Sequence, residues 1–407
     1  NGVYIQLRSF GYGFYGLTMF NKMGLTEGVL FGAPDPFHLN EPNPGLDDLT
    51  VYYTDLYRTI QEANLFIENM SQVDASVVGD ESVKNSLIGE ARFLRGLAYF
   101  YILRSYGEHF DTSSQFGAVL RDTPTREASA IARNSVADTY AFITADFQYA
   151  IDNCANNLNF RASEFAAKAM LAKTKLYEGD YAAASSVAAD VIANSGGRVF
   201  ADPYANNFSV FGVTATIDSP ELLFAPYTNG VDERMGSIPD MDYFSGLYPI
   251  YGTGDPRFGV SKGSAINFGP NGLERNAASQ IHIRLSEVYL IHAEAEARLG
   301  TGVDAVALAS LNAIRTRSAV GLPAYVDGVD ITSKPELLEA IRLEKLLELY
   351  AENGEEFFDL VRFAKLDGLD PSTIKPSMTD PTFYILPIPN QERLAVGGDI
   401  VDQNPGY

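Results

Sequence analysis

Apolar residues recur at three- and four-residue steps along most of the chain, which is the spacing that places them on one face of an α-helix. In the first such stretch, Leu56, Ile60, Ala63 and Ile67 share a face. The same pattern predicts helices over residues 50–70, 82–106, 135–152, 164–178, 181–193, 285–299, 303–318 and 335–352. The predicted fold class is therefore mainly α, with little β structure.

Two of the predicted helix pairs have the same arrangement, with alanine-rich faces on both sides of a turn that contains glycine. One pair turns at Gly179 and the other at Gly300. Small residues let antiparallel helices approach closely, as in tetratricopeptide units, whose helical hairpins stack on one another. The two glycines lie 121 positions apart rather than at a regular 34-residue period. We therefore predict degenerate, interrupted tetratricopeptide-like hairpins.

The interruption, residues 196–281, is rich in Gly, Pro, Asn, Asp and Tyr and has no sustained helical period. Residues 219–226 within it favour a short strand. A loop segment of this length is usually functional, and insertions into helical repeats gather on one face, which is often the binding face. We predict a single domain, 1–407, with a helical scaffold at about 50–195 and 282–366, an irregular ligand-facing insertion at about 196–281 and an extended tail at 367–407.

Residues 341–363 place charged and aromatic side chains unusually close together. Glu344 and Glu348 interrupt an apolar helical face, and Phe357 and Phe358 follow a break at residues 353–354. Some of these charges must lie beside the apolar face, where they are tolerated only when paired and hydrogen-bonded. The segment is therefore either a structural network of ion pairs or a functional site.

Charge and composition exclude several classes of function. The formal charge of −22 argues against nucleic acid as a partner, because phosphate contacts need clustered Lys and Arg. Cys154 is the single cysteine, and the four histidines lack the spacing of metal ligands, so neither a cysteine-based nor a histidine-rich metal site is expected. No cofactor is expected, and the sequence leaves a structural metal ion open. No signal peptide is recognisable at Asn1. We expect it to have been removed together with any lipidated cysteine.

Several motifs occur in a characteristic order along the chain. They are EARFLRGLAYFYILRSYG at 90–107, DPRF at 255–258, IRLSEVYLIHAEA at 283–295, LNAIRTR at 311–317, the segment 341–363, YILPIP at 384–389 and QNPGY at 403–407. Together they resemble the SusD/RagB family of outer-membrane nutrient-binding lipoproteins of Bacteroidetes. Lys345, Glu356 and Phe363 depart from the family pattern.

This resemblance implies a binding protein rather than an enzyme. The family's members are lipid-anchored at the cell surface, where they cover a SusC-like TonB-dependent outer-membrane transporter and deliver glycans or oligopeptides to it. The resemblance further implies that paired charges join the last helical hairpin to the rest of the protein. The residues expected in this network are Arg342, Glu344, Glu348, Asp359 and Arg362.

Ligand contacts are expected in the irregular segments, where aromatic rings could stack on sugar rings. The chain has no Trp, so Tyr and Phe would supply the stacking surface. The candidate contacts are Phe37, His38, Tyr243, Tyr248, Tyr251, Arg257, Asn267 and Phe268. For each aromatic residue, packing within a loop is the alternative.

Three functions remain open from the sequence. The favoured one is capture of oligosaccharide or polysaccharide for a SusC-like transporter. The second is uptake of peptide or glycopeptide by the same architecture. The third is a tetratricopeptide-type scaffold that binds a protein partner and no small ligand.

Overall fold

The computed structural model of the chain describes residues 2–7, 16–24, 35–127, 131–208, 210–211, 216–217, 219–225, 255–257, 281–349, 352–395 and 400–407. These residues form a mainly α-helical protein with two short two-stranded sheets. The predicted fold class is confirmed.

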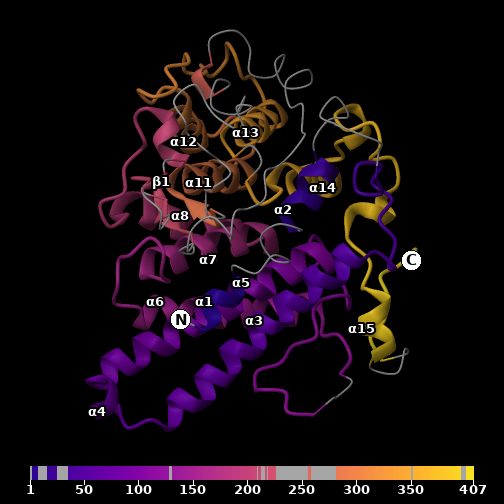
Figure 1. Cartoon of the computed structure of the whole chain (residues 1–407). Helices are drawn as coiled ribbons and strands as arrows, with labels where there is room; N and C mark the ends of the chain where they lie inside the picture. Colours follow the sequence, from indigo (N-terminus) through magenta and orange to yellow (C-terminus); the bar gives the residue numbers. More distant parts are fainter. Residues whose placement is uncertain are drawn as a thin grey trace.

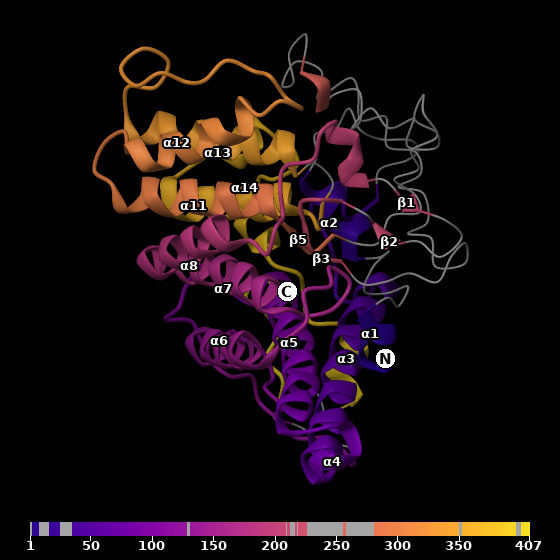
Figure 2. The same cartoon turned by 90° about the vertical axis from the view of Figure 1, so that its left-hand side faces the viewer.

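A stack of packed helices forms the scaffold (Figure 2). Each helix packs on the next in the order α5 (Glu81–Tyr106), α6 (Val136–Asn153), α7 (Glu164–Glu178), α8 (Tyr181–Asn194) and α11 (Leu285–Leu299). Helix α11 also contacts α12 (Ala305–Arg315) and α13 (Lys334–Glu348), and α13 contacts α14 (Glu355–Asp367). Since α8 and α11 are in contact, the chain leaves the stack after α8 and returns to the same place.

Further helices flank this stack (Figure 1). Helix α3 (Asp47–Gln72) packs along α5, and the short α4 (Ala75–Val78) connects the two. Near the N-terminus, α1 (Gly2–Leu7) contacts α3 and α2 (Gly16–Gly24) contacts α14. The remaining elements are η3 (Tyr204–Phe208), η6 (Pro371–Thr373), η7 (Pro381–Tyr384) and α15 (Asn390–Ala395), the last of which contacts α3.

The two sheets lie in or next to the predicted insertion. Strand β1 (Val210–Phe211) pairs with β2 (Thr216–Ile217), and β3 (Leu222–Phe224) pairs antiparallel with β5 (Ile283–Arg284). Strand β3 confirms the strand expected within 219–226. Because β3 precedes and β5 follows residues 226–280, their pairing brings the two ends of this segment together at the scaffold.

Local sequence explains where the helices begin and end. The Ser163 and Asp180 side chains accept hydrogen bonds from backbone amides at the starts of α7 and α8, as N-cap residues do. Helix α13 ends at Glu348, earlier than the predicted residue 352. The chain then turns through Asn353 and Gly354, whose φ angles of 55° and 69° are left-handed and incompatible with a continuous helix. The predicted break at this dipeptide is confirmed.

The apolar faces predicted from the sequence form the core. Leu56, Ile60 and Ala63 of α3 belong to the main buried cluster, which extends across α5, α6, α7, α8 and α14. A second buried cluster joins α11, α12 and α13. None of the described helices combines the length and the apolar character needed to cross a membrane.

Candidate functional site

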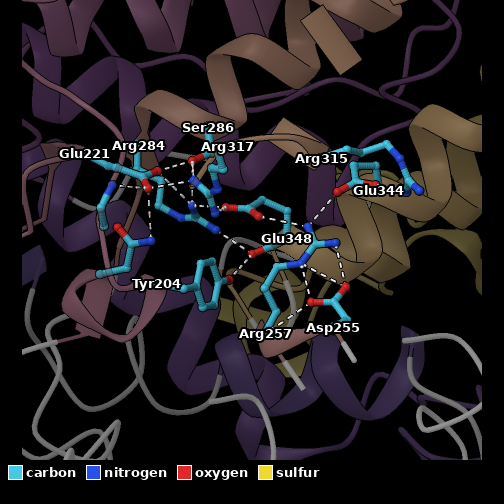
Figure 3. Close-up of polar contacts among 12 residues, drawn as sticks. Tyr204, Glu221, Asp255, Arg257, Arg284, Ser286, Arg315, Arg317, Glu344 and Glu348 are labelled. Atoms are coloured by element: carbon cyan, nitrogen blue, oxygen red, sulfur yellow. Dashed lines mark hydrogen bonds and ion pairs between the residues drawn. The ribbon is translucent and has the colours of Figure 1, made fainter. Parts of the chain in front are cut away.

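The most unusual feature of the described residues is a group of buried, paired charges at the end of α13, which we call the Glu348 cluster (Figure 3). It joins residues that are far apart in the sequence. Its members are Glu221, Asp255, Arg257, Arg284, Arg315, Arg317, Glu344, Glu348 and Glu352.

Glu348 lies at the centre of this cluster and pairs with three arginines. Its Oε1 accepts hydrogen bonds from Arg284 Nη1 and Arg317 Nη2, both at 2.6 Å, and its Oε2 accepts from Arg257 Nη1 at 3.0 Å. Burial alone would raise the pKa of Glu348, but the charges of the three arginines outweigh it and hold the pKa well below its usual range. Glu348 is therefore ionised in the folded protein.

Arg257 attaches the middle of the insertion to α13. Its guanidinium donates to Asp255 Oδ2 at 2.8 Å and to Glu344 Oε1 at 2.6 Å, and its backbone amide donates to Asp255 Oδ1 at 2.9 Å. The Asp255 carboxylate thus fixes both the backbone and the side chain of Arg257. The side chain is fully buried, with 0% exposure.

The two ends of the insertion's central segment reach the same cluster. Glu221, just before β3, accepts from Arg317 Nη1 at 2.7 Å and from Arg284 Nη1 at 3.1 Å. Arg284, at the end of β5, also pairs with Glu352 at 3.0 Å. Within and after the segment 226–280, Arg257 and Arg284 therefore bond directly to α13. Before it, Glu221 is joined to α13 through Arg284 and Arg317.

Other charges of the segment 341–363 contact different helices. Lys345 Nζ lies 2.6 Å from Asp359 and 3.2 Å from Glu294 of α11, and Arg362 pairs with both of these carboxylates. Glu355 accepts from Arg104 of α5 at 2.6 Å and from Lys173 of α7 at 2.7 Å. The ion pairs of this segment thus connect α13 and α14 to the helical stack as well as to the insertion.

Arg342 differs from the other residues expected in the network. Its guanidinium pairs at 2.7 Å with Glu339 of the same helix, whose side chain is 46% exposed. This pair lies within α13, so it does not join the hairpin to another element. The sequence does not reveal that Arg284 and Arg317 pair with Glu348, although both arginines lie in recognised motifs. Nor does it reveal that Glu221 pairs with the same two arginines.

Three of the candidate ligand contacts are buried in the described structure. Phe37 is 3% exposed and packs in the main core, and His38 is 8% exposed, with its backbone carbonyl accepting from Lys375 Nζ and Ser377 Oγ, each at 2.9 Å. Arg257 is held in the Glu348 cluster. We therefore revise these three to structural residues, because a ligand cannot reach their side chains in this conformation.

The remaining candidate contacts are Tyr243, Tyr248, Tyr251, Asn267 and Phe268, and they lie outside the described residues. The boundaries of the ligand-facing insertion likewise stay a prediction. Within the described part of the chain, no three His, Cys, Asp or Glu side chains are grouped so that they could hold a metal ion.

Two family models match this chain. One, described as the SusD family, matches residues 256–407, and the other, described as starch-binding associating with outer membrane, matches residues 38–176. The chain belongs to the SusD/RagB family. The resemblance seen in the sequence is thereby confirmed. The two matched ranges leave residues 177–255 between them, so Glu221 and Asp255 of the Glu348 cluster lie outside both matches.

Known SusD-like proteins show the same relationship. A SusD-like protein of Bacteroides ovatus is 33% identical over 163 residues. The aligned region covers 37% of this chain and only 28% of the length of that relative. A SusD superfamily structure from Bacteroides thetaiotaomicron aligns with a TM-score of 0.80 at 22% identity, covering 99% of this chain and 97% of the other. A laminarin-binding SusD-like protein aligns with a TM-score of 0.74 at 23% identity, covering 100% and 97% of the two chains. At these identities the two structures establish the fold alone.

The ion pairs predict a loss of stability in acid. Burial would raise the pKa of Glu355, but Lys173 and Arg104 outweigh it and hold the pKa at about 2. A glutamate in the unfolded chain has a pKa of about 4.3, so ionised Glu355 stabilises the fold above that pH and the contribution is lost as pH falls toward 2. We expect this group alone to account for about 3 kcal/mol.

Urea denaturation of the wild type and Glu355→Gln, from about pH 7 to about pH 2.5, would measure this contribution. The difference in unfolding free energy between the two proteins should shrink as the pH falls. Glu339→Gln, on the exposed side of α13, should follow the wild-type profile. A difference between wild type and Glu355→Gln that is independent of pH would contradict the assignment.

Proposed function

We propose that this protein is a cell-surface glycan-binding protein, which captures oligosaccharide or polysaccharide at the outer membrane and delivers it to a SusC-like TonB-dependent transporter. Membership of the SusD/RagB family supports the proposal, as does the description of the model that matches residues 38–176. The name of the laminarin-binding relative supports a glycan as the ligand class.

The structural observation that carries the proposal is the attachment of the insertion to the scaffold at three points. A long irregular segment has many conformations, and a ligand that must order it loses affinity to conformational entropy. The Glu348 cluster fixes Glu221, Arg257 and Arg284 relative to one another, so the chain between them is divided into two shorter closed segments. Such an arrangement suits presentation of a preformed binding surface on a rigid body.

Binding without catalysis is the activity that we propose for this surface. Glycoside hydrolysis needs two carboxyl groups that face the sugar, and one of them must remain protonated. The carboxylates of the Glu348 cluster are instead buried and paired with arginines. The proposed ligand contacts are Tyr243, Tyr248, Tyr251, Asn267 and Phe268, through ring stacking and hydrogen bonds to sugar hydroxyls.

This function is tested by affinity electrophoresis in gels that contain starch, laminarin or xylan. Binding of unfolded peptides is measured in parallel. We expect the wild type to be retarded by at least one of the glycans. Each stacked ring is worth about 1 kcal/mol, so Tyr248→Ala/Tyr251→Ala should weaken binding roughly 30-fold. Binding of peptides with no retardation by any glycan would replace this function with peptide uptake, and binding of neither would favour a protein-interaction scaffold.

A further inference from the structure

A pocket of about 430 Å³ lies between α3, the segment that follows α5 and the C-terminal part of the chain. Figure 1 shows the purple-to-magenta loop between α5 and α6 and the yellow α15 beside α3. The volume is within the range of about 300–1,000 Å³ that is typical of small-ligand sites. None of the residues that line the pocket belongs to the Glu348 cluster.

Hydrogen bonds between side chains and backbone fix the walls of this pocket. Gln61 of α3 donates to the Thr125 carbonyl at 2.9 Å and accepts from the Thr125 amide at 2.8 Å. Asn64 donates to the carbonyls of Arg121 and Thr123 at 3.0 and 3.2 Å. Because the wall is already ordered, a ligand would bind without a large loss of conformational entropy.

The pocket combines an aromatic surface with polar groups. The rings of Tyr53 and Tyr57 lie 4.7 Å apart between centroids, and Val119, Ile131 and Val401 add apolar surface. The Tyr57 hydroxyl is already bonded to the backbone of Val119, so this residue offers the pocket its ring rather than its hydroxyl. An apolar ring of this kind stacks well on the C–H face of a pyranose.

The charged groups of the pocket have both signs. Glu392 accepts from Thr54 Oγ1 at 3.0 Å, and its carboxylate has capacity for further donors. Arg58 has a 53% exposed side chain and pairs with Asp55 at 2.9 Å. An acceptor and a donor on the same rim fit hydroxyl groups, which act as both. An anionic ligand would be repelled by Glu392 and by the net charge of −22.

We propose that this pocket binds one neutral pyranose unit and forms a second glycan contact besides the insertion. The inference rests on the proposed glycan-binding function. Two contacts on one protein can hold the same polysaccharide chain, so the second would strengthen retention of a long glycan more than that of a short one. The pocket thereby adds avidity for polymers.

The test uses a variant that fills the pocket, Thr54→Phe, and a matched control, Asn69→Phe, which adds the same ring at an exposed position of α3. Thr54→Phe should weaken retention in polysaccharide gels about tenfold, whereas Asn69→Phe should leave it unchanged. Glu392→Gln, which keeps a hydrogen-bond acceptor for Thr54, should weaken retention to a smaller extent. Thermal denaturation of each variant establishes that it is folded.

A second readout separates this inference from the proposed function. Laminarihexaose, maltohexaose and xylohexaose are titrated while the tyrosine ring NMR signals are followed, with Tyr57 assigned by substitution with Phe. A Tyr57 shift in the wild type that is lost in Thr54→Phe supports the pocket. If a glycan retards the wild type and Thr54→Phe equally and does not shift the Tyr57 signal, the pocket is wrong while the glycan-binding function stands. Absence of both retention and shift overturns the glycan function and the pocket together.

Discussion

Replacing Glu348 with alanine is expected to destabilise the protein by about 3–5 kcal/mol, the cost of removing one partner from a buried ion pair. Three arginines, Arg257, Arg284 and Arg317, would each lose a carboxylate within the protein interior. Their remaining partners are other buried acids, so the positive charge would be only partly compensated. Denaturant unfolding followed by circular dichroism would measure the loss.

The control for this change lies on the same helix. Glu339→Ala removes an ion pair whose carboxylate is 46% exposed, and such pairs contribute about 0–1 kcal/mol. A small effect at Glu339 and a large one at Glu348 would show that burial determines the cost. Equal effects at the two positions, or loss of glycan binding by Glu348→Ala with unchanged stability, would contradict a structural role for Glu348.

Much of the fold follows from the spacing of apolar residues. Helices α7 and α11 begin and end where the sequence places them, because Ser163 caps the first and glycine follows both. The break at Asn353 and Gly354 was predictable because these two residue types adopt left-handed backbone angles more readily than others. Local periodicity and turn chemistry are sufficient for such features.

The partners of the buried charges could not be predicted in the same way. The sequence indicates that Glu348 must be paired, but its partners lie 31, 64 and 91 positions away, and only the packed helices bring them together. Arg257 illustrates the consequence. Its position as a polar residue in an irregular segment predicts a ligand contact, whereas the fold places its side chain in the interior. For Phe37 the structure favours the alternative of packing, because this loop residue lies in the main core.

Replacing Arg257 with methionine is expected to have an effect of similar size, again about 3–5 kcal/mol. Asp255 would lose its guanidinium partner, and Glu344 and Glu348 would each lose one of theirs. The variant should also bind glycan more weakly, because the middle of the insertion would no longer be joined to α13. Arg95→Met is the control for stability, since Arg95 forms a similarly buried pair with Asp146 at 2.7 Å between α5 and α6.

Hydrogen exchange of the peptide that covers residues 255–257 tests most directly whether the Glu348 cluster holds the insertion on the scaffold. The Arg257 amide donates to Asp255 in the folded protein, so it should exchange slowly in the wild type and in Arg95→Met. In Arg257→Met it should exchange much faster, while the amides of α6 and α7 keep their protection. Unchanged protection at residues 255–257 in Arg257→Met would contradict the account.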